Sequence, residues 1–288
     1  MDYISILLWV VIFLSLFYPV LQRRQIELNR LRVIANLQKK RGTRVITLIH
    51  REESISFFGI PFRKMIDIED SEQILRVIRE TPDEMPIDLI LHTPGGLVLA
   101  SEQIARALIR RKGKVTCFIP HYAMSGGTLI ALAADEIVID KNAVMGPIDP
   151  QLGGYPAISI LKAVERKNIN DLEDQTLILA DIAEKAMTQV YELVIEILSD
   201  KEKEGIFTRE KIEDIAKELT SGKWTHDYPL TCERIKNLGL NVSFNMPEDV
   251  YTLMSLYPQA GVGRPSVQFV PLPIQPSKKG KSEHEDKY

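Results

Sequence analysis

Short apolar segments alternate with amphipathic segments between residues 44 and 140, and this alternation restricts the chain to few architectures. The expected strands, rich in Val, Ile and Leu, are residues 44–50, 87–93, 114–120 and 136–140. The expected helices, with apolar side chains at helical spacing, are residues 71–80, 98–112 and 127–134. Ser71 is the expected N-cap of the first helix. Strands that alternate with helices form crossover units, so we expect an α/β fold whose largely parallel sheet is covered by helices.

The segments that follow this core have different patterns. After Pro150 the expected structure is mainly helical, over about 172–199 and about 208–219, with a short late strand at 241–245. Before the first helix, residues 54–62 are expected to contain a strand end and a Gly-Ile-Pro loop. The end of the chain is rich in proline and charge and has no periodicity, so we expect residues 261–288 to be disordered.

The N-terminal segment is apolar enough to indicate a membrane anchor. Residues 3–21 carry no charged side chain, and this run approaches the length that a helix needs to cross a bilayer. A cleaved signal peptide would need positive charge before the run, whereas here Asp2 precedes it and Arg23 and Arg24 follow it. We therefore expect an uncleaved, single-pass anchor over residues 1–22, with 3–21 embedded in the lipid bilayer of the cell membrane.

A basic segment follows the apolar run and predicts the orientation of the protein. Between residues 22 and 44, Glu27 is the single acidic residue. The basic residues there are Arg23, Arg24, Arg30, Arg32, Lys39, Lys40, Arg41 and Arg44. Positive charge favours the cytoplasmic side, so we expect the body of the protein to be cytoplasmic. Residues 23–43 have helical spacing, and this helix is expected to contact anionic headgroups or to act as a solvated linker.

Composition limits the remaining partners. The formal net charge of −3 and the lack of a nucleic-acid motif give no reason to expect nucleic acid as a partner. Cys117 lies in an expected strand and is interpreted as a buried reduced thiol, and with Cys232 as the other cysteine no disulfide framework or zinc site is expected. The sequence contains no P-loop, dinucleotide fingerprint or metal-ligand spacing, so we expect neither a cofactor nor a metal.

Three glycine-bearing turns follow successive expected strands, at 92–96, 121–127 and 142–150. The carboxyl ends of parallel strands share one edge of a sheet, so these turns should converge. Ser125, followed by Gly126 and Gly127, lies where a strand gives way to a helix, beside free N–H groups and the positive end of the helix dipole. A nucleophile there, with an N–H from the earlier Gly95-Gly96 turn, suits attack on a carbonyl and stabilisation of the oxyanion. The alternative is that Ser125 simply caps its helix, which would not require the earlier turn.

These motifs resemble a known group of peptidases. The segments "HTPGGLVLASEQIARAL" and "AMSGGTLIALAADEIVIDKNAVMGPIDPQL" are similar to the Clp protease and signal peptide peptidase A superfamily, within the wider ClpP/crotonase-like fold. Over residues 44–257 the chain resembles the membrane-anchored serine dehydrogenase proteinases, whose late segment looks like "SGKWTHDYPLTCERIKNLGL". The resemblance implies a catalytic domain over 44–260 that assembles into a homo-oligomer. It also implies that Ser125 is the nucleophile, that Gly95 and Gly126 supply the oxyanion-hole amides, and that Gly96 completes the turn.

The general base cannot be the one that Clp peptidases use. Those enzymes carry a histidine in the segment that matches residues 142–150, where this chain has Met145, Gly146 and Pro147. One alternative is His226, oriented by Asp149, which gives the Ser-Asp-His order that the resemblance implies. Asp149 between Ile148 and Pro150 is otherwise explained as a turn residue.

A lysine is the second alternative for the base, as in signal peptide peptidases. Lys185 lies in an expected helix between apolar neighbours, where burial would lower its pKa, although it is also explained as a surface partner of a nearby acid. Lys167, in the preceding loop, is a further candidate. His92 and His121 flank the glycine turns and either point into the site or are buried at strand ends.

Together these features predict a membrane-anchored, cytoplasm-facing serine endopeptidase. It would hydrolyse peptide bonds of a peptide or protein substrate through an acyl-enzyme on Ser125. The missing Clp-type histidine favours a non-catalytic membrane scaffold as an alternative. A crotonase-type enzyme that acts on an acyl-CoA would use the oxyanion donors without a nucleophile, and the serine directly before Gly126 disfavours it.

Overall fold

The structure is a computed structural model that describes residues 3–51, 65–203 and 205–257. The predictions for residues 54–62 and for the tail 261–288 therefore lie outside the described residues.

A five-stranded parallel sheet forms the centre of the described chain, in the order β1-β2-β3-β5-β10. Its strands are β1 (Arg44–Ile49), β2 (Ile87–His92), β3 (Val115–Ile119), β5 (Glu136–Ile139) and β10 (Val242–Ser243). Each predicted strand of the alternating core, and the short late strand, is confirmed. Every residue of β2 is buried, as expected for the middle of a sheet that is covered on both faces.

Side chains of β2 point alternately into two separate cores. Leu89 and Leu91 join the larger core under helices α3 (Val98–Ile109), α4 (Gly126–Leu132), α6 (Asp174–Lys203) and α7 (Arg209–Thr220). Ile90 joins the smaller core, under the C-terminal part of α1 (Tyr3–Arg41) and α9 (Glu248–Ser255). Cys117 of β3 is buried and unpaired, which confirms the expected reduced thiol.

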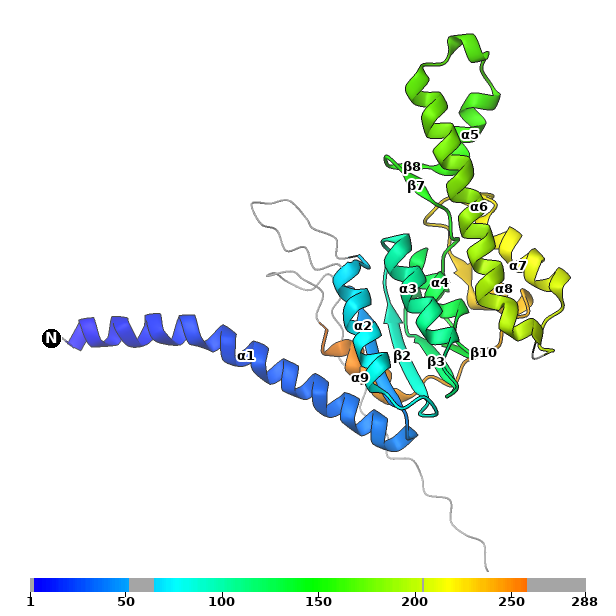
Figure 1. The fold of residues 1–288 in the computed structure, drawn as a ribbon. Helices are drawn as coiled ribbons and strands as arrows, with labels where there is room; N and C mark the ends of the chain where they lie inside the picture. Colours follow the sequence, from blue (N-terminus) through cyan, green and yellow to red (C-terminus); the bar gives the residue numbers. More distant parts are fainter. Residues whose placement is uncertain (1–2, 52–64, 204, 258–288) are drawn as a thin grey trace, which may run out of the picture.

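Helix α1 runs without interruption through the predicted anchor and the predicted juxtamembrane helix. Its C-terminal part packs on the body through Leu37, whereas its N-terminal part projects away (Figure 1). Within the described ranges, no helix combines the length and the apolarity that crossing a bilayer demands. The spanning helix predicted over residues 3–21 is therefore not confirmed.

Helix α2 (Ile68–Glu80) begins earlier than predicted. Its N-cap is Asp67, whose side chain accepts a hydrogen bond from the Asp70 amide (2.9 Å), while the Asp70 carboxylate accepts one from the Asp67 amide (3.1 Å). This capping box replaces the predicted cap at Ser71. Ser71 lies buried in the first turn, and its hydroxyl donates to the Ile68 carbonyl (2.8 Å).

The smaller elements sit at the carboxyl edge of the main sheet. Strand β4 (Tyr122–Ala123) pairs in parallel with β6 (Val144–Met145), and β6 pairs antiparallel with β9 (Leu230–Thr231). Residues 151–156 form the hairpin of β7 (Gln151–Leu152) and β8 (Tyr155–Pro156). The remaining helices are α5 (Ala157–Glu165), the 3-10 turn η1 (Ile169–Asp171) and α8 (Cys232–Asn237). Helix α5 and the first part of α6 extend together from the body as an arm (Figure 1).

A buried carboxylate joins the end of α1 to the sheet. Asp88 of β2, with its side chain 1% exposed, pairs with Arg41 and accepts a hydrogen bond from the Thr43 hydroxyl (2.8 Å). Asp88→Ala should lower the free energy of unfolding by about 3 kcal/mol, because it leaves a partly buried guanidinium without its partner. Urea unfolding of the full chain in detergent measures this change. The exposed Arg76–Glu80 pair is the control, because Arg76→Ala should cost less than about 0.5 kcal/mol, and equal losses from both variants would contradict the assignment.

Candidate active site

Ser125 occupies a strained turn between β4 and α4. Its backbone angles are φ 49° and ψ −113°, and it is the one non-glycine residue with positive φ in the described chain. Such conformations cost free energy and concentrate at functional positions, including the strand-to-helix elbows that present nucleophilic serines. A Cβ on Gly126 would lie 2.3 Å from the Ser101 hydroxyl oxygen, and one on Gly127 would lie 2.6 Å from Cγ2 of Thr93. The two glycines after Ser125 are thus required by close packing.

The hydroxyl of Ser125 does not cap helix α4. Ser125 stands at the N-cap position, is partly exposed, and makes no side-chain hydrogen bond to the helix. The Gly127 amide instead donates to the Met124 carbonyl (2.7 Å). The capping explanation of this serine is therefore wrong, and its hydroxyl is left available at the sheet edge.

The Gly95-Gly96 turn lies directly against Ser125. A Cβ on Gly95 would be 2.8 Å from Cβ of Ser125, and Gly95 also has a positive φ of 104°. Both the close contact and the backbone conformation therefore exclude a larger residue at this position. On the other side of the turn, a Cβ on Gly96 would be 2.2 Å from the Ile66 carbonyl oxygen. The turn is thus wedged between the serine and the segment before α2.

Hydrogen bonding decides which amide of this turn is free. The Gly95 N–H donates to the Thr93 hydroxyl oxygen (3.2 Å). Gly95 and Leu97 make the two bonds of a parallel bridge to Ile66, which points the Gly96 N–H to the opposite side. Among the described residues, the Gly96 N–H has no partner, and its nitrogen is 3.6 Å from the position of a Cβ on Gly126. The free amides beside Ser125 are therefore those of Gly96 and Gly126, and the Gly95 amide assigned from sequence is already occupied.

Asp149 and His226 are brought together at the same edge. Asp149 Oδ1 lies 2.6 Å from His226 Nδ1, with side chains 1% and 38% exposed. Topology explains the meeting: Ser125 follows β4, Asp149 follows the parallel strand β6, and His226 precedes the antiparallel strand β9. Gln151 donates to the other Asp149 oxygen (2.6 Å), which fixes the carboxylate.

The carboxylate changes the basicity of the imidazole. The hydrogen bond with Asp149 raises the pKa of His226, partial burial opposes this, and the charges of Asp149 and Asp227 add to the rise. In the described chain no hydrogen bond joins the Ser125 hydroxyl to His226. The serine with its amides and the His–Asp pair are therefore two separate units along one edge.

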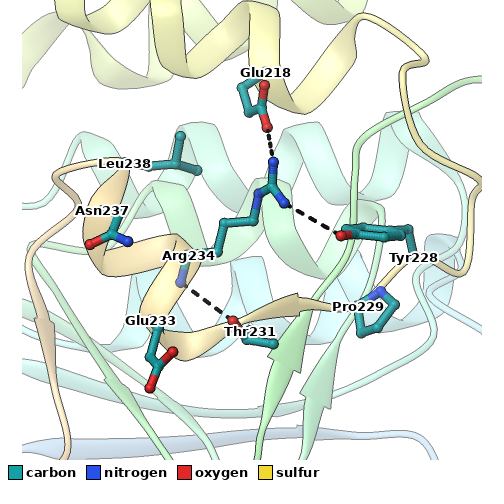
Figure 2. Close-up of a pocket in the computed structure, with 8 residues that line it drawn as sticks. All are labelled: Glu218, Tyr228, Pro229, Thr231, Glu233, Arg234, Asn237 and Leu238. Atoms are coloured by element: carbon teal, nitrogen blue, oxygen red, sulfur yellow. Dashed lines mark hydrogen bonds and ion pairs between the residues drawn. The ribbon is translucent and has the colours of Figure 1, made fainter.

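An aromatic cluster holds the loop that carries His226. The rings of Trp224 and Tyr228 stack with centroids 4.1 Å apart, and the Arg234 guanidinium lies 4.3 Å from the Trp224 ring. Figure 2 shows Arg234 between Glu218 and the Tyr228 hydroxyl. Stacking brings residues 224 and 228 together at the two ends of the turn that contains His226. Sequence reasoning missed this cluster, although the Trp-x-x-x-Tyr spacing around His226 is a usable signal.

Both lysine candidates for the general base are exposed to solvent. Lys185 is 67% exposed and pairs with Asp181 one turn earlier on α6 (2.6 Å), so its expected burial is wrong. Lys167, after α5, is exposed as well. Apolar spacing misled the prediction, because this part of α6 belongs to the projecting arm.

The two histidines beside the turns behave differently from His226. His92 is buried, and burial lowers its pKa to about 3, with the charges of Arg51, His121 and His50 adding to the effect. It packs against the ring of Tyr122 at 4.2 Å and is neutral at ordinary pH. His121 is exposed and stacks on His92 at 5.6 Å. His92 is therefore buried at the end of β2, whereas His121 is exposed.

A groove of about 520 Å³ leads away from this edge between α3 and α6. Val98, two residues after Gly96, lines one end, and Gln151, which bonds Asp149, lines the other side. Its lining combines apolar residues with three glutamates and with Arg106, which pairs with Glu102 and Glu196. The lining residues are Val98, Glu102, Arg106, Pro150, Gln151, Leu152, Ala186, Gln189, Val190, Glu192, Leu193 and Glu196. Ser125 is not among these lining residues, and Gln151 connects the groove with the Asp149–His226 pair.

Comparison with known proteins identifies relatives over the whole chain. A family model described as "ClpP-like SDH-type serine proteinase" matches residues 1–285. An uncharacterised protein of Methanocaldococcus jannaschii is 58% identical over 262 residues, covering 91% of this chain and 88% of the relative. A second uncharacterised protein of that organism is 55% identical over 271 residues, covering 94% and 93%.

Two solved structures match the chain at low sequence identity, with TM-scores below 0.5. A membrane-bound stomatin-specific protease matches with 18% identity and a TM-score of 0.42, over 67% of this chain and 79% of that one. ClpP1 from Listeria monocytogenes matches with 16% identity and a TM-score of 0.43, over 73% and 96%.

Titration of His226 tests the paired geometry. Because Asp149 stabilises the imidazolium, the pKa of His226 should lie above its ordinary value of about 6.5, and Asp149→Asn should lower it. The pair should stabilise the folded state below the unfolded pKa, and this contribution should be lost as pH rises through the higher folded pKa. Proton NMR of the imidazole measures the titration. Asp227→Asn is the matched control with a smaller effect, and a titration unmoved by Asp149→Asn would contradict the pairing.

Proposed function

Because the chain belongs to the ClpP-like SDH-type serine proteinase family, we propose that it hydrolyses peptide bonds through an acyl-enzyme on Ser125. The observation that carries the proposal is the strained Ser125 backbone, which leaves an uncapped hydroxyl beside two amides. A non-functional helix cap would need neither the strain nor the Gly96 amide.

The mechanism combines Ser125 and its two amides with the His226–Asp149 pair. His226 takes the proton of the Ser125 hydroxyl as the oxygen attacks the substrate carbonyl, and the Gly96 and Gly126 amides stabilise the oxyanion. The imidazolium, stabilised by Asp149, returns the proton to the leaving amine as the C–N bond breaks. Water, deprotonated by the same imidazole, then attacks the ester and releases the acid and the free serine.

This mechanism requires His226 to approach Ser125. Hydrogen bonds between catalytic groups are often long in unliganded enzymes and tighten in the substrate complex. The imidazole is 38% exposed and sits on a short loop, so it has room to turn while Asp149 stays buried. Substrate binding in the α3–α6 groove, or assembly with another copy, supplies the closure in this proposal.

Labelling with a fluorophosphonate probe tests the nucleophile. The wild-type protein should be labelled, Ser125→Ala should abolish labelling, and His226→Ala should slow it by about a hundredfold or more, since the base is lost. Lys185→Ala is the control, because an exposed lysine in a surface pair should leave the rate unchanged. Labelling that survives Ser125→Ala would remove the proposal.

The scaffold alternative retains one supporting observation, which is the missing hydrogen bond between Ser125 and His226 in the described chain. Under that alternative the folded wild-type protein would resist the probe.

The uncharged run of residues 3–21 and the exposed Trp9, Phe13 and Phe17 on one side of α1 support a membrane anchor, with the catalytic body in the cytoplasm. Exposed Ile169, Ile178 and Ile182 on the arm support a homo-oligomer.

Cell fractionation tests the anchor. The full chain should stay in the membrane pellet after alkaline carbonate extraction, because its apolar segment is held in hydrocarbon rather than by charge. A chain that begins at residue 23 should move to the supernatant. Extraction of the full chain under the same conditions would contradict the anchor, and a chain with Arg23 and Arg24 both changed to Gln controls for purely electrostatic attachment.

A further inference from the structure

Thr93 connects the two glycine turns of the site through its backbone. Its N–H donates to the Tyr122 carbonyl (3.2 Å), and its carbonyl accepts from the Met124 amide (3.0 Å). Its Cγ2 methyl fills the space beside Gly127, where an added Cβ would be 2.6 Å away. Thr93 is fully buried, and these contacts with both turns fix its position.

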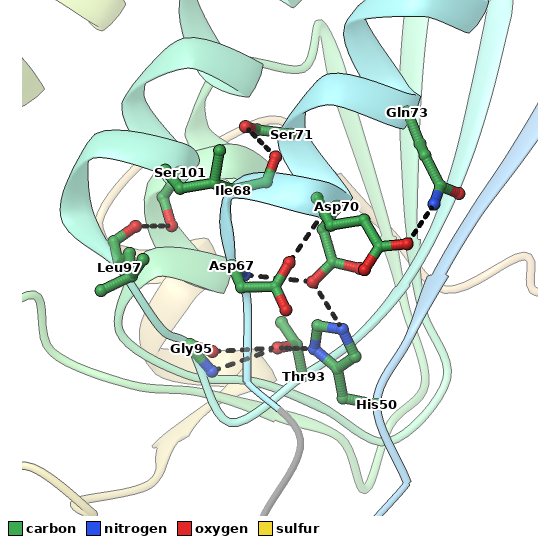
Figure 3. Close-up of polar contacts among 11 residues, drawn as sticks. His50, Asp67, Ile68, Asp70, Ser71, Gln73, Thr93, Gly95, Leu97 and Ser101 are labelled. Carbon is green, nitrogen blue, oxygen red and sulfur yellow. Dashed lines mark hydrogen bonds and ion pairs between the residues drawn. The ribbon is translucent and has the colours of Figure 1, made fainter.

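The Thr93 hydroxyl faces a buried histidine and the Gly95 amide (Figure 3). His50 Nδ1 lies 2.9 Å from Oγ1 of Thr93, and the His50 side chain is 2% exposed. The backbone amide of His50 donates to the His92 carbonyl (2.7 Å), which holds His50 at the carboxyl edge of the sheet. The hydroxyl therefore has a donor on one side and a histidine nitrogen on the other.

A carboxylate completes the row. Asp70 Oδ2 lies 3.1 Å from His50 Nε2, within the distance of an ion pair (Figure 3). Asp70 is itself fixed, because its carboxylate accepts from the Asp67 amide at the start of α2. A carboxylate beside Nε2 favours the proton on that nitrogen. With this tautomer the Thr93 hydroxyl donates to His50 Nδ1 (2.9 Å) rather than to the more distant Gly95 carbonyl oxygen (3.4 Å), and a lone pair of Oγ1 accepts from the Gly95 N–H.

We propose that His50 and Thr93 are positioning residues for the oxyanion hole, in an Asp70–His50–Thr93–Gly95 row that holds the Gly95 amide inward. The next peptide plane is held through the Gly95 carbonyl, which accepts from the Ile66 amide (2.8 Å) and lies 3.4 Å from the same Thr93 hydroxyl, so that the Gly96 N–H points away from Ile66 on the side of Gly126. The inference rests on the proposed function for its effect on catalysis. Its structural part, the fixed direction of two successive amides, stands without it.

Paired variants separate the hydroxyl from the bulk of Thr93. Thr93→Val keeps the methyl beside Gly127 and removes the hydroxyl, whereas Thr93→Ser keeps the hydroxyl and removes the methyl. With a peptide substrate, Thr93→Val should lower kcat by about tenfold to a hundredfold with little change in KM, because it loosens an oxyanion donor. Thr93→Ser should recover most of kcat. If the role of Thr93 were purely structural, loss of the methyl would matter more than loss of the hydroxyl, and Thr93→Ser would have a lower kcat than Thr93→Val.

A second pair tests the histidine. His50→Leu removes both ring nitrogens, while His50→Asn keeps a polar group near the position of Nδ1. His50→Leu should lower kcat as Thr93→Val does, and His50→Asn should recover part of it. Circular dichroism confirms that each variant is folded. Equal kcat in Thr93→Val and Thr93→Ser would overturn the proposal.

Amide exchange gives a readout that does not need activity. The full chain, labelled with ¹⁵N-glycine in detergent, should show a protected Gly95 amide, which Thr93→Val exposes to exchange and Thr93→Ser keeps protected. Exchange at Gly95 that is unaffected by Thr93→Val would overturn the proposal. Failure of the proposed function has a separate signature, because wild-type Ser125 would then resist the fluorophosphonate while Gly95 exchange still reports the row.

Discussion

The contact between Gly95 and Ser125 is the constraint on which the site depends. An added Cβ on Gly95 would collide with the Ser125 side chain, and Gly126 and Gly127 are just as tightly enclosed by Ser101 and Thr93. Two turns that are distant in sequence are thus packed backbone against side chain, with little space for either to move. Because the packing is this dense, the strained backbone conformation of Ser125 is the one that fits the available space.

The two halves of the site differ in rigidity. In the proposed site, the oxyanion side is paired at Thr93 and Ile66 and enclosed by glycine contacts, with Thr93 and Gly95 buried. The base side consists of a partly exposed imidazole on a loop whose ends are stacked together, above a buried carboxylate. Electrostatic stabilisation depends on groups that are oriented before reaction, whereas a proton carrier has to move between atoms. The distribution of burial matches these two requirements.

The sequence predicts the sheet well because β1, β2, β3 and β5 are apolar runs whose burial depends on local pattern alone. The Asp149–His226 pairing is expected from the resemblance to serine dehydrogenase proteinases, since no local pattern places His226, which precedes the antiparallel strand β9, beside Asp149. The prediction from sequence fails at Ser71, where the Asp67–Asp70 capping box starts the helix earlier, and at Lys185, where apolar spacing gives no sign that α6 leaves the body. The His50–Thr93 contact joins residues 43 apart on different strands, which no local pattern reveals.

Helix α1 has a mechanical consequence for the body of the protein. It is 39 residues long without a break, and it ends in the buried ion pair of Arg41 with Asp88 on the central strand β2. A continuous helix transmits rotation as well as distance, and each residue contributes about 100° of turn. The length of α1 therefore sets the direction in which the groove faces relative to the N-terminal part of the helix. Inserting a single residue in α1 would rotate the groove around the helix axis, while inserting a full turn would nearly restore its original direction.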